Sequence, residues 1–266
     1  MERIREAFQR SRAPRLIPFI MAGDPDMETT VSLLRLLDQE GATAVEVGFP
    51  FSDPLADGPV IQQAAWRALS QGVTLHRLWE MVSIARERGV QVPLILFSYY
   101  NPLLSYGLRP LVTDAKRAGF NGLIVPDLPV EESEGLRELC DQAGLALIPL
   151  VAPTSRERIG KIASRARGFV YCVSSLGTTG RRERFSHGVE RFLQEVRSRS
   201  PVPIVVGFGI SREEHVRHFS RFADGVVVGS ALVEQIASVS EKLRREEDRP
   251  QALEDIRRFV RRLKTE

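Results

Sequence analysis

The feature that most constrains the fold of this chain is a regular alternation of short apolar runs with amphipathic stretches. Apolar residues in the stretches recur at helical spacing, as in Val31, Leu34 and Leu37. Strictly alternating strands and helices imply parallel strands joined by crossover helices. The predicted strands are 16–21, 44–48, 93–98, 122–125, 146–151, 169–173, 203–207 and 225–228. Glycines that suit the left-handed ends of helices stand shortly before five of them: Gly41, Gly89, Gly119, Gly144 and Gly168.

Eight such units in one chain predict an α/β fold, a closed (β/α)8 TIM barrel. An open doubly wound sheet is the alternative. Because no linker or low-complexity segment interrupts the pattern, we expect a single barrel domain over residues 1–266. Extra helices are expected at the N-terminus, after the second strand (60–71) and after the eighth strand (230–236). Thr154 and Ser211, each three residues before a glutamate, predict capping boxes.

Composition and charge exclude several classes of function. A net charge of +3, without a basic run interleaved with aromatic residues, predicts no nucleic-acid partner. Two cysteines, Cys140 and Cys172, cannot form a disulfide framework and indicate a reducing compartment. His215 and His218 lack the pattern of a zinc helix, so no metal is expected. No apolar run is long enough for a membrane span, and the N-terminus does not resemble a signal peptide, so we expect a cytoplasmic protein without a membrane partner.

Carboxylates in and after the second predicted strand indicate an acid/base site. Alternation along the strand places Ala44, Glu46 and Gly48 on the face toward the barrel interior. Burial would raise the pKa of Glu46 toward neutrality, as suits a group that gives and takes a proton. A structural glutamate paired with a buried base is the alternative. Asp57 follows in a proline-rich loop, where catalysis and helix capping are both open, whereas Asp53 favours a turn-forming role.

Glycine turns after the last three predicted strands indicate an anion site. The turns lie at 174–180, 207–211 and 229–231, and the last of them opens a helix. Phosphate sites of (β/α)8 enzymes commonly use the loops after strands 7 and 8, so we expect phosphate binding there. Aromatic residues near the strand ends suit either the core or a pocket for a flat ring: Phe19, Phe97, Tyr99, Tyr100, Tyr171 and Phe208.

The segment Glu46-Val-Gly-Phe-Pro-Phe-Ser-Asp-Pro-Leu-Ala-Asp-Gly-Pro59 resembles the signature of the tryptophan synthase α subunit family. Further matches cover essentially the whole chain in the family's order, at 18–25, 127–133, 174–180, 207–211 and 229–233.

This resemblance implies a retro-aldol cleavage of indole-3-glycerol phosphate to indole and glyceraldehyde 3-phosphate, without a cofactor. It implies that Glu46 is the general acid/base, that Asp57 accepts the indole N–H, and that Thr179 on a mobile loop helps to close the site. The implied indole-binding residues are Phe19, Ile61, Phe97, Tyr99 and Tyr171. The implied phosphate-binding residues are Gly180, Gly207, Gly209, Gly229 and Ser230, with Phe208 beside them.

The family also implies a partner, a pyridoxal-phosphate-dependent β subunit in an α2β2 complex that receives the indole. Loops 53–59, 101–107 and 177–184 would form or influence that contact. Arg181, Arg182 and Arg184 make the last loop more basic than is typical of the family, which leaves their role open. The alternatives are a stand-alone lyase that releases free indole, another phosphate-sugar isomerase barrel, and an inactive scaffold subunit.

Overall fold

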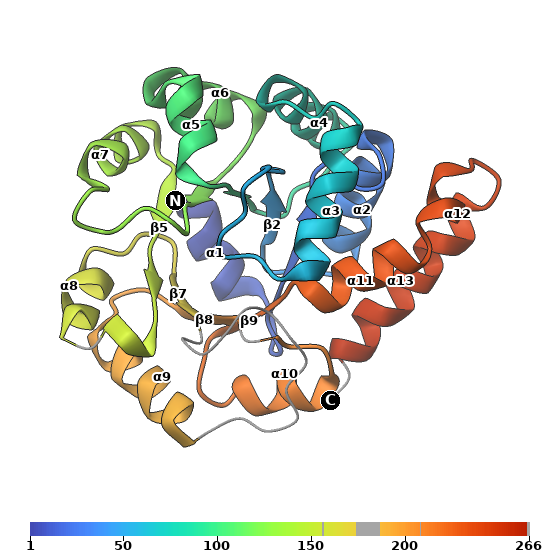
Figure 1. Ribbon diagram of the computed structural model, residues 1–266. Helices are drawn as coiled ribbons and strands as arrows, with labels where there is room; N and C mark the ends of the chain where they lie inside the picture. The colour runs from blue at the N-terminus through green and yellow to red at the C-terminus, as the bar shows by residue number, and fades with distance from the viewer. Residues whose placement is uncertain (156, 174–186, 208, 265–266) are drawn as a thin grey trace.

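Parallel strands form a ring surrounded by helices in the computed structural model, which describes residues 1–155, 157–173, 187–207 and 209–264 (Figure 1). Neighbouring strands pair in the order β5-β4-β3-β2-β1-β9-β8-β7-β6. The strands are β1 (Leu16–Met21), β2 (Val45–Gly48), β3 (Leu94–Phe97), β4 (Gly122–Ile124), β5 (Ala146–Ile148), β6 (Leu150–Val151), β7 (Val170–Val173), β8 (Ile204–Gly207) and β9 (Gly225–Val228). Because β5 and β6 are separated only by Pro149, this order closes on itself and confirms the predicted barrel rather than an open sheet.

The fifth predicted strand, 146–151, is divided into β5 and β6 in the structure. Proline has no backbone N–H to donate to a neighbouring strand, so Pro149 interrupts the ladder. Its carbonyl still accepts a hydrogen bond from the Tyr171 N–H at 3.0 Å, which keeps the chain alongside β7.

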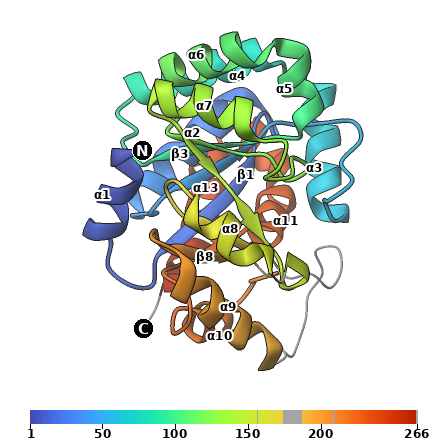
Figure 2. The same cartoon turned by 90° about the vertical axis from the view of Figure 1, so that its left-hand side faces the viewer.

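Helices cover the outside of the ring and both of its ends. Three helices that are additional to the strand–helix units were predicted: α1 at the N-terminus, α3 after β2 and α11 after β9. A further additional helix, α5, was not predicted from the sequence pattern. Figure 2 shows α1 at one end of the barrel and α3 at the other. The helices are α1 (Glu2–Arg10), α2 (Met27–Gln39), α3 (Pro59–Ser70), α4 (Leu75–Glu87), α5 (Tyr100–Tyr106), α6 (Leu108–Ala118), α7 (Glu134–Ala143), α8 (Arg158–Ser164) after the short 3-10 turn Pro153–Ser155, α9 (His187–Arg199), α10 (Glu213–Phe219), α11 (Ser230–Ser238), α12 (Ser240–Arg244) and α13 (Arg249–Lys264).

Side-chain alternation along the strands separates an inner from an outer core. Val45 and Val47 pack in the large cluster that includes the helices, whereas Ala44 belongs to the cluster inside the barrel. Ile4 and Phe8 of α1 join that inner cluster. They close the amino-terminal end of the barrel, so the carboxyl ends of the strands form its open mouth.

Both predicted capping boxes are wrong. Thr154 lies in the 3-10 turn before α8, and Arg212 rather than Ser211 precedes α10. Among the N-caps that the structure describes, Asp26 accepts from the Thr29 N–H at 2.7 Å and Thr74 accepts from the Arg77 N–H at 3.3 Å. The capping-box pattern failed because the N-cap residues are Glu157 in α8 and Arg212 in α10, three residues and one residue beyond the predicted caps.

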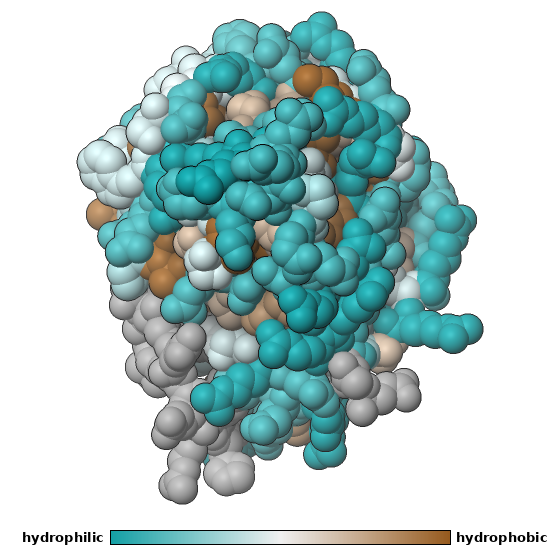
Figure 3. Space-filling model, turned by 90° about the vertical axis from the view of Figure 1, so that its right-hand side faces the viewer, coloured by the Kyte–Doolittle hydropathy of each residue, from teal (hydrophilic) through white to brown (hydrophobic). Residues whose placement is uncertain are grey.

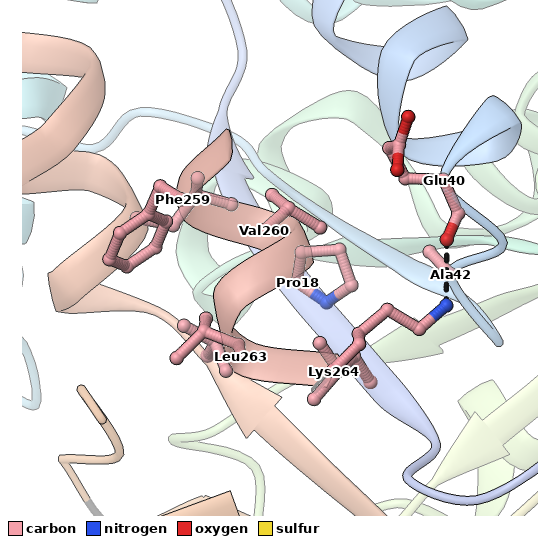
Figure 4. Close-up of a pocket in the computed structure, with 10 residues that line it drawn as sticks. Pro18, Glu40, Ala42, Phe259, Val260, Leu263 and Lys264 are labelled. Carbon is pink, nitrogen blue, oxygen red and sulfur yellow. Dashed lines mark hydrogen bonds between the residues drawn. The ribbon is translucent and has the colours of Figure 1, made fainter. Parts of the chain in front are cut away.

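The C-terminal helix α13 is docked against the barrel by apolar and polar contacts. Phe259, Val260 and Leu263 face β1 around a small pocket, and Lys264 donates to the backbone carbonyl of Glu40 at 2.6 Å (Figure 4). The pocket, about 10 Å³, is at the limit for a single water molecule, so it is a packing gap rather than a ligand site.

The flank that carries α12 and α13 is mainly hydrophilic, with only small separate hydrophobic areas (Figure 3). Among the described residues, no helix is long and apolar enough to cross a membrane. The same residues contain no group of three or more potential metal-ligating side chains.

Candidate active site

Glu46 lies in the middle of β2, with Phe19 of β1 and Ile95 of β3 as its register partners. It is fully buried, and neither of its carboxyl oxygens has a hydrogen-bond partner among the described residues. The structural alternative, a glutamate paired with a buried base, is therefore wrong for the part of the chain that the structure describes. An unpartnered buried carboxyl is costly and rare, which makes a functional role the better explanation.

Burial raises the pKa of Glu46 well above its ordinary value, because the ionised form loses its hydration. A carboxyl with a raised pKa keeps its proton to a higher pH than an exposed carboxyl does. This environment suits a general acid/base, which must carry the proton in one step and release it in another.

Asp57 is half-buried in the loop between β2 and α3. Its backbone carbonyl accepts a hydrogen bond from Gln62 Nε2 at 2.8 Å. The residue at the N-cap of α3 is Gly58, so the capping alternative for Asp57 is wrong. Asp53, by contrast, is exposed and accepts a hydrogen bond from the neighbouring Ser52 hydroxyl at 2.5 Å, in agreement with a role in the turn.

Tyr99, which follows β3, holds the Asp57 loop. Its hydroxyl accepts the Ala56 N–H at 2.9 Å and forms a hydrogen bond with the Asp57 carboxylate. Burial raises the pKa of Asp57, and the hydrogen bond from Tyr99 opposes that rise. Tyr99 is therefore placed to fix the loop and to favour the ionised form of Asp57, a function beyond the indole contact predicted for it.

Replacing Tyr99 with phenylalanine is expected to raise the pKa of Asp57, because the hydrogen bond that favours the carboxylate is lost while the burial remains. If the ionised carboxylate is the active form, the acid limb of the kcat/KM–pH profile moves to higher pH. The profile of indole release would measure this shift. Tyr100→Phe, at the neighbouring position on α5, is the matched control, and an unmoved acid limb in Tyr99→Phe would contradict the assignment.

Apolar side chains from several elements meet near the two carboxyls. The Phe19 and Phe97 rings are 5.6 Å apart in an edge-to-face arrangement, and Ile61 of α3 packs in the same cluster. Tyr171 on β7 is buried, and its pKa is raised well above the ordinary value, first by burial and then by the charges of Glu46 and Asp57. The structure thus brings these four predicted indole-binding residues to the end of the barrel that holds both acids.

The described part of the predicted phosphate site lies on the neighbouring strands β8 and β9. Gly207 ends β8, Gly209 has a φ of +56°, and Gly229 is the N-cap of α11, which begins at Ser230. A Cβ atom at Gly207 would lie 2.5 Å from the Tyr171 hydroxyl, so only glycine fits there. The N-terminus of α11 presents backbone N–H groups and a positive dipole end to the same region. Thr179, Gly180 and Phe208 lie outside the described residues, as do Arg181, Arg182 and Arg184.

Two supports of the site were not predicted from the sequence. Gln62 holds the backbone of Asp57, and Arg67 forms an ion pair with the buried carboxylate of Asp24. Asp24 and Arg67 are 43 residues apart, so no local spacing connects them. The only sequence signal was an aspartate directly after an apolar strand.

Known proteins match this chain over nearly its whole length. The family model described as "Tryptophan synthase alpha chain" matches residues 6–264. The tryptophan synthase alpha chain of Shouchella clausii (strain KSM-K16) is 51% identical over 259 residues, which cover 97% of this chain and 96% of that protein.

Solved structures give the same result. An alpha-chain structure from Legionella pneumophila has a TM-score of 0.84 at 35% identity, covering 98% of this chain and 99% of its own. A structure of the tryptophan synthase a2b2 complex from Pyrococcus furiosus contains a chain with a TM-score of 0.84 and 38% identity, covering 94% of this chain and 97% of that one. With both its sequence and its fold matched over nearly the whole length, this chain belongs to the tryptophan synthase alpha chain family, and so to the enzymes of tryptophan synthesis.

Proposed function

We propose that this chain cleaves indole-3-glycerol phosphate to indole and glyceraldehyde 3-phosphate by a retro-aldol reaction. The observation that carries the proposal is the buried carboxyl of Glu46, unpartnered among the described residues, at the same end of the barrel as a second carboxyl, Asp57. Two carboxyls in different environments can take different roles in one reaction. The edge-to-face pair of Phe19 and Phe97 supports a flat aromatic substrate.

In this proposal Glu46 moves the protons of the reaction. Its protonated form gives a proton to the ring carbon that bears the side chain, and positive charge then develops on the indole nitrogen. Asp57, in its ionised form, accepts the indole N–H and stabilises that charge. The Glu46 carboxylate takes the proton from the side-chain hydroxyl next to the ring, the carbon–carbon bond breaks, and its electron pair restores the aromatic ring. Indole and the aldehyde leave, and Glu46 is again protonated.

The remaining groups bind and orient the substrate. Gly207, Gly209 and the N-terminus of α11 at Gly229 and Ser230 would hold the phosphate through backbone N–H groups. Phe19, Ile61, Phe97 and Tyr171 would enclose the ring. Of the residues outside the described ones, we propose that Gly180 helps to hold the phosphate with Phe208 beside it, and that Thr179 helps to close the site. The proton transfers use only side chains, so we propose no cofactor in this chain and place pyridoxal phosphate in the partner.

The partner in this proposal is a tryptophan synthase β subunit in an α2β2 complex, which takes the indole and joins it to serine. The relative from Pyrococcus furiosus is described in such a complex. Leu55 and Leu104 support the same assembly here. Leu55 is 90% exposed in loop 53–59, and Leu104 is 54% exposed on α5, which the structure forms in the predicted contact segment 101–107. Exposed apolar side chains that lie together mark contact surfaces, and the hydrogen bond from the Ala56 N–H to the Tyr99 hydroxyl joins loop 53–59 to the N-cap residue of α5.

Adding a β subunit is expected to raise the rate of indole-3-glycerol phosphate cleavage by this chain, because the proposed contact loop carries Asp57.

Leu55→Asp and Leu104→Asp should weaken the complex by on the order of tenfold each, since each buries a charge in the interface. Turnover with and without the β subunit, together with titration of the complex, measures both effects. Ile84→Asp on α4 is the matched control, because Ile84 is also exposed (39%) but lies on another element. Equal turnover with and without the partner would favour the stand-alone lyase.

The other candidates have less support. An isomerase of the phosphate-sugar type would need its acid/base pair on other strands, commonly the first and fifth. The fifth predicted strand, which is β5 and β6 in the structure, ends in the apolar residues Leu150 and Val151. An inactive scaffold has no need for a buried carboxyl such as Glu46, which lacks a partner among the described residues.

A further inference from the structure

An ion pair joins the turn after β1 to the last turn of α3. Arg67 donates from Nε to Asp24 Oδ1 at 2.7 Å and from Nη2 to Asp24 Oδ2 at 2.8 Å. The Asp24 side chain is 2% exposed, compared with 9% for Glu40, which pairs with two arginines of α13. Two parallel charge-assisted hydrogen bonds fix both the distance and the direction of approach. The pair therefore sets the position of α3 relative to β1.

The Asp24 side of the pair is itself anchored. The Gly23 N–H donates to the buried Thr30 hydroxyl of α2 at 2.9 Å, and the Asp24 N–H donates to the Met21 carbonyl at 3.3 Å. Gly23 has a φ of +80°, and a side chain there would overlap Val73, which follows α3. The turn after β1 is thus held by both α2 and the chain beyond α3, and it provides a fixed point for Arg67.

The other end of α3 carries parts of the site. Asp57 stands two residues before the helix begins at Pro59, and Gln62 of the helix holds its carbonyl at 2.8 Å. Ile61 is 5% exposed and packs with Phe19. Ile61 and Arg67 are six residues apart, about 9 Å along a helix that rises 1.5 Å per residue. Because a helix is stiff over that length, a change of its orientation at Arg67 displaces Asp57 and Ile61.

We propose that the Asp24–Arg67 ion pair is a positioning element, which sets the orientation of α3 and so places Asp57 and Ile61 in the site. The proposal rests on the function proposed above. Stability alone gives a weak reason for the pair, since an apolar pair of similar volume commonly stabilises a protein as well as a buried ion pair does. Neither residue is a catalytic residue, because both act through α3.

Arg67→Lys tests the proposal, since lysine keeps the charge but cannot form the two parallel hydrogen bonds. In the complex with the β subunit, kcat for indole release is expected to fall on the order of tenfold or more, because small displacements of a catalytic group are costly. KM should change by less than about threefold, since the proposed phosphate contacts lie on β8 and β9 rather than on α3. The matched control is Arg261→Lys, which breaks the similarly bidentate pair with Glu40 (2.8 and 3.0 Å) on α13. This control should leave kcat within about twofold of wild type, whatever it does to Tm.

A double-mutant cycle separates positioning from general damage. In an Asp57→Asn background, Arg67→Lys is expected to lower kcat by less than about threefold, because the charge that α3 places is already absent. The proposal is overturned if the tenfold loss recurs in that background, or if Arg67→Lys keeps wild-type kcat. Asp24→Asn, a near-isosteric change, gives a second test of the same pair should Arg67→Lys fold poorly. If Glu46→Gln is inactive while both ion-pair variants keep kcat, only the positioning role fails; if Glu46→Gln is fully active, the proposed function fails first.

Discussion

The Glu46→Gln variant is expected to lose indole release by on the order of a thousandfold, within the range that general acid/base catalysis contributes. Glutamine has nearly the same shape as glutamate but cannot transfer the proton between the ring carbon and the hydroxyl. The loss should therefore appear in kcat, with little change in KM. An indole-release assay on the isolated chain and on the complex with a β subunit measures it, and wild-type turnover would refute the assignment of Glu46.

The stability of this variant provides the control. The folded-state pKa of Glu46 is raised by burial, so the carboxyl favours the folded state below its ordinary pKa, and this contribution is lost as the pH rises through the folded-state value. The wild-type free energy of unfolding is thus expected to fall, relative to that of Glu46→Gln, as the pH rises above about 4.5. Thermal unfolding of both proteins across pH measures the difference. An inactive variant that is at least as stable as the wild type near neutral pH has lost chemistry rather than structure.

Replacing Asp57 with asparagine is expected to lower kcat by on the order of a hundredfold, as with the loss of one well-placed electrostatic group. The asparagine carbonyl can still accept the indole N–H, but it carries no charge to balance the positive charge on the ring. KM for indole-3-glycerol phosphate should change little, because the phosphate is bound elsewhere. The acid limb that Asp57 gives to the kcat/KM–pH profile should also disappear.

Asp53→Asn is the matched control for this change, since Asp53 lies in the same loop but is exposed and hydrogen-bonded to its neighbour Ser52. In the isolated chain it is expected to keep turnover within about threefold of wild type, as surface changes usually do. A similar loss in both variants would mean that the loop, rather than the Asp57 carboxylate, is what matters.

Some features of the structure can be predicted from local sequence patterns. Alternation of apolar and polar residues depends only on strand geometry, so the inward direction of Glu46 and the outward direction of Val45 and Val47 could be predicted from the residue pattern of the strand. Glycines at helix ends are equally local, and Gly119 and Gly144 adopt the left-handed conformation at the ends of α6 and α7. The resemblance carried by residues 46–59 then supplied the roles of the acids.

Other predictions from local sequence patterns were wrong. The capping boxes at Thr154 and Ser211 were wrong because a capping side chain is useful only at the N-cap itself, which is Glu157 in α8 and Arg212 in α10. The extra helix α5 was missed because its seven residues, Tyr100–Tyr106, are too few to show a helical period. The apolar run 146–151 predicted one continuous strand, but Pro149 divides it into β5 and β6.

The alternation of strands and helices, the inward direction of Glu46 and the glycine turns follow from local sequence, because each depends on residues close together in the chain. Three features of the site are properties of the folded chain instead: Glu46 has no base beside it among the described residues, Tyr99 supports Asp57, and Asp24 pairs with Arg67. The Tyr99 and Arg67 contacts each span 43 positions of the chain, and the parallel pairing of β1, β2 and β3 is what brings these residues together. Burial, hydrogen bonding and pKa depend on such neighbours, so they become defined only once the strands have paired and the helices have packed against them.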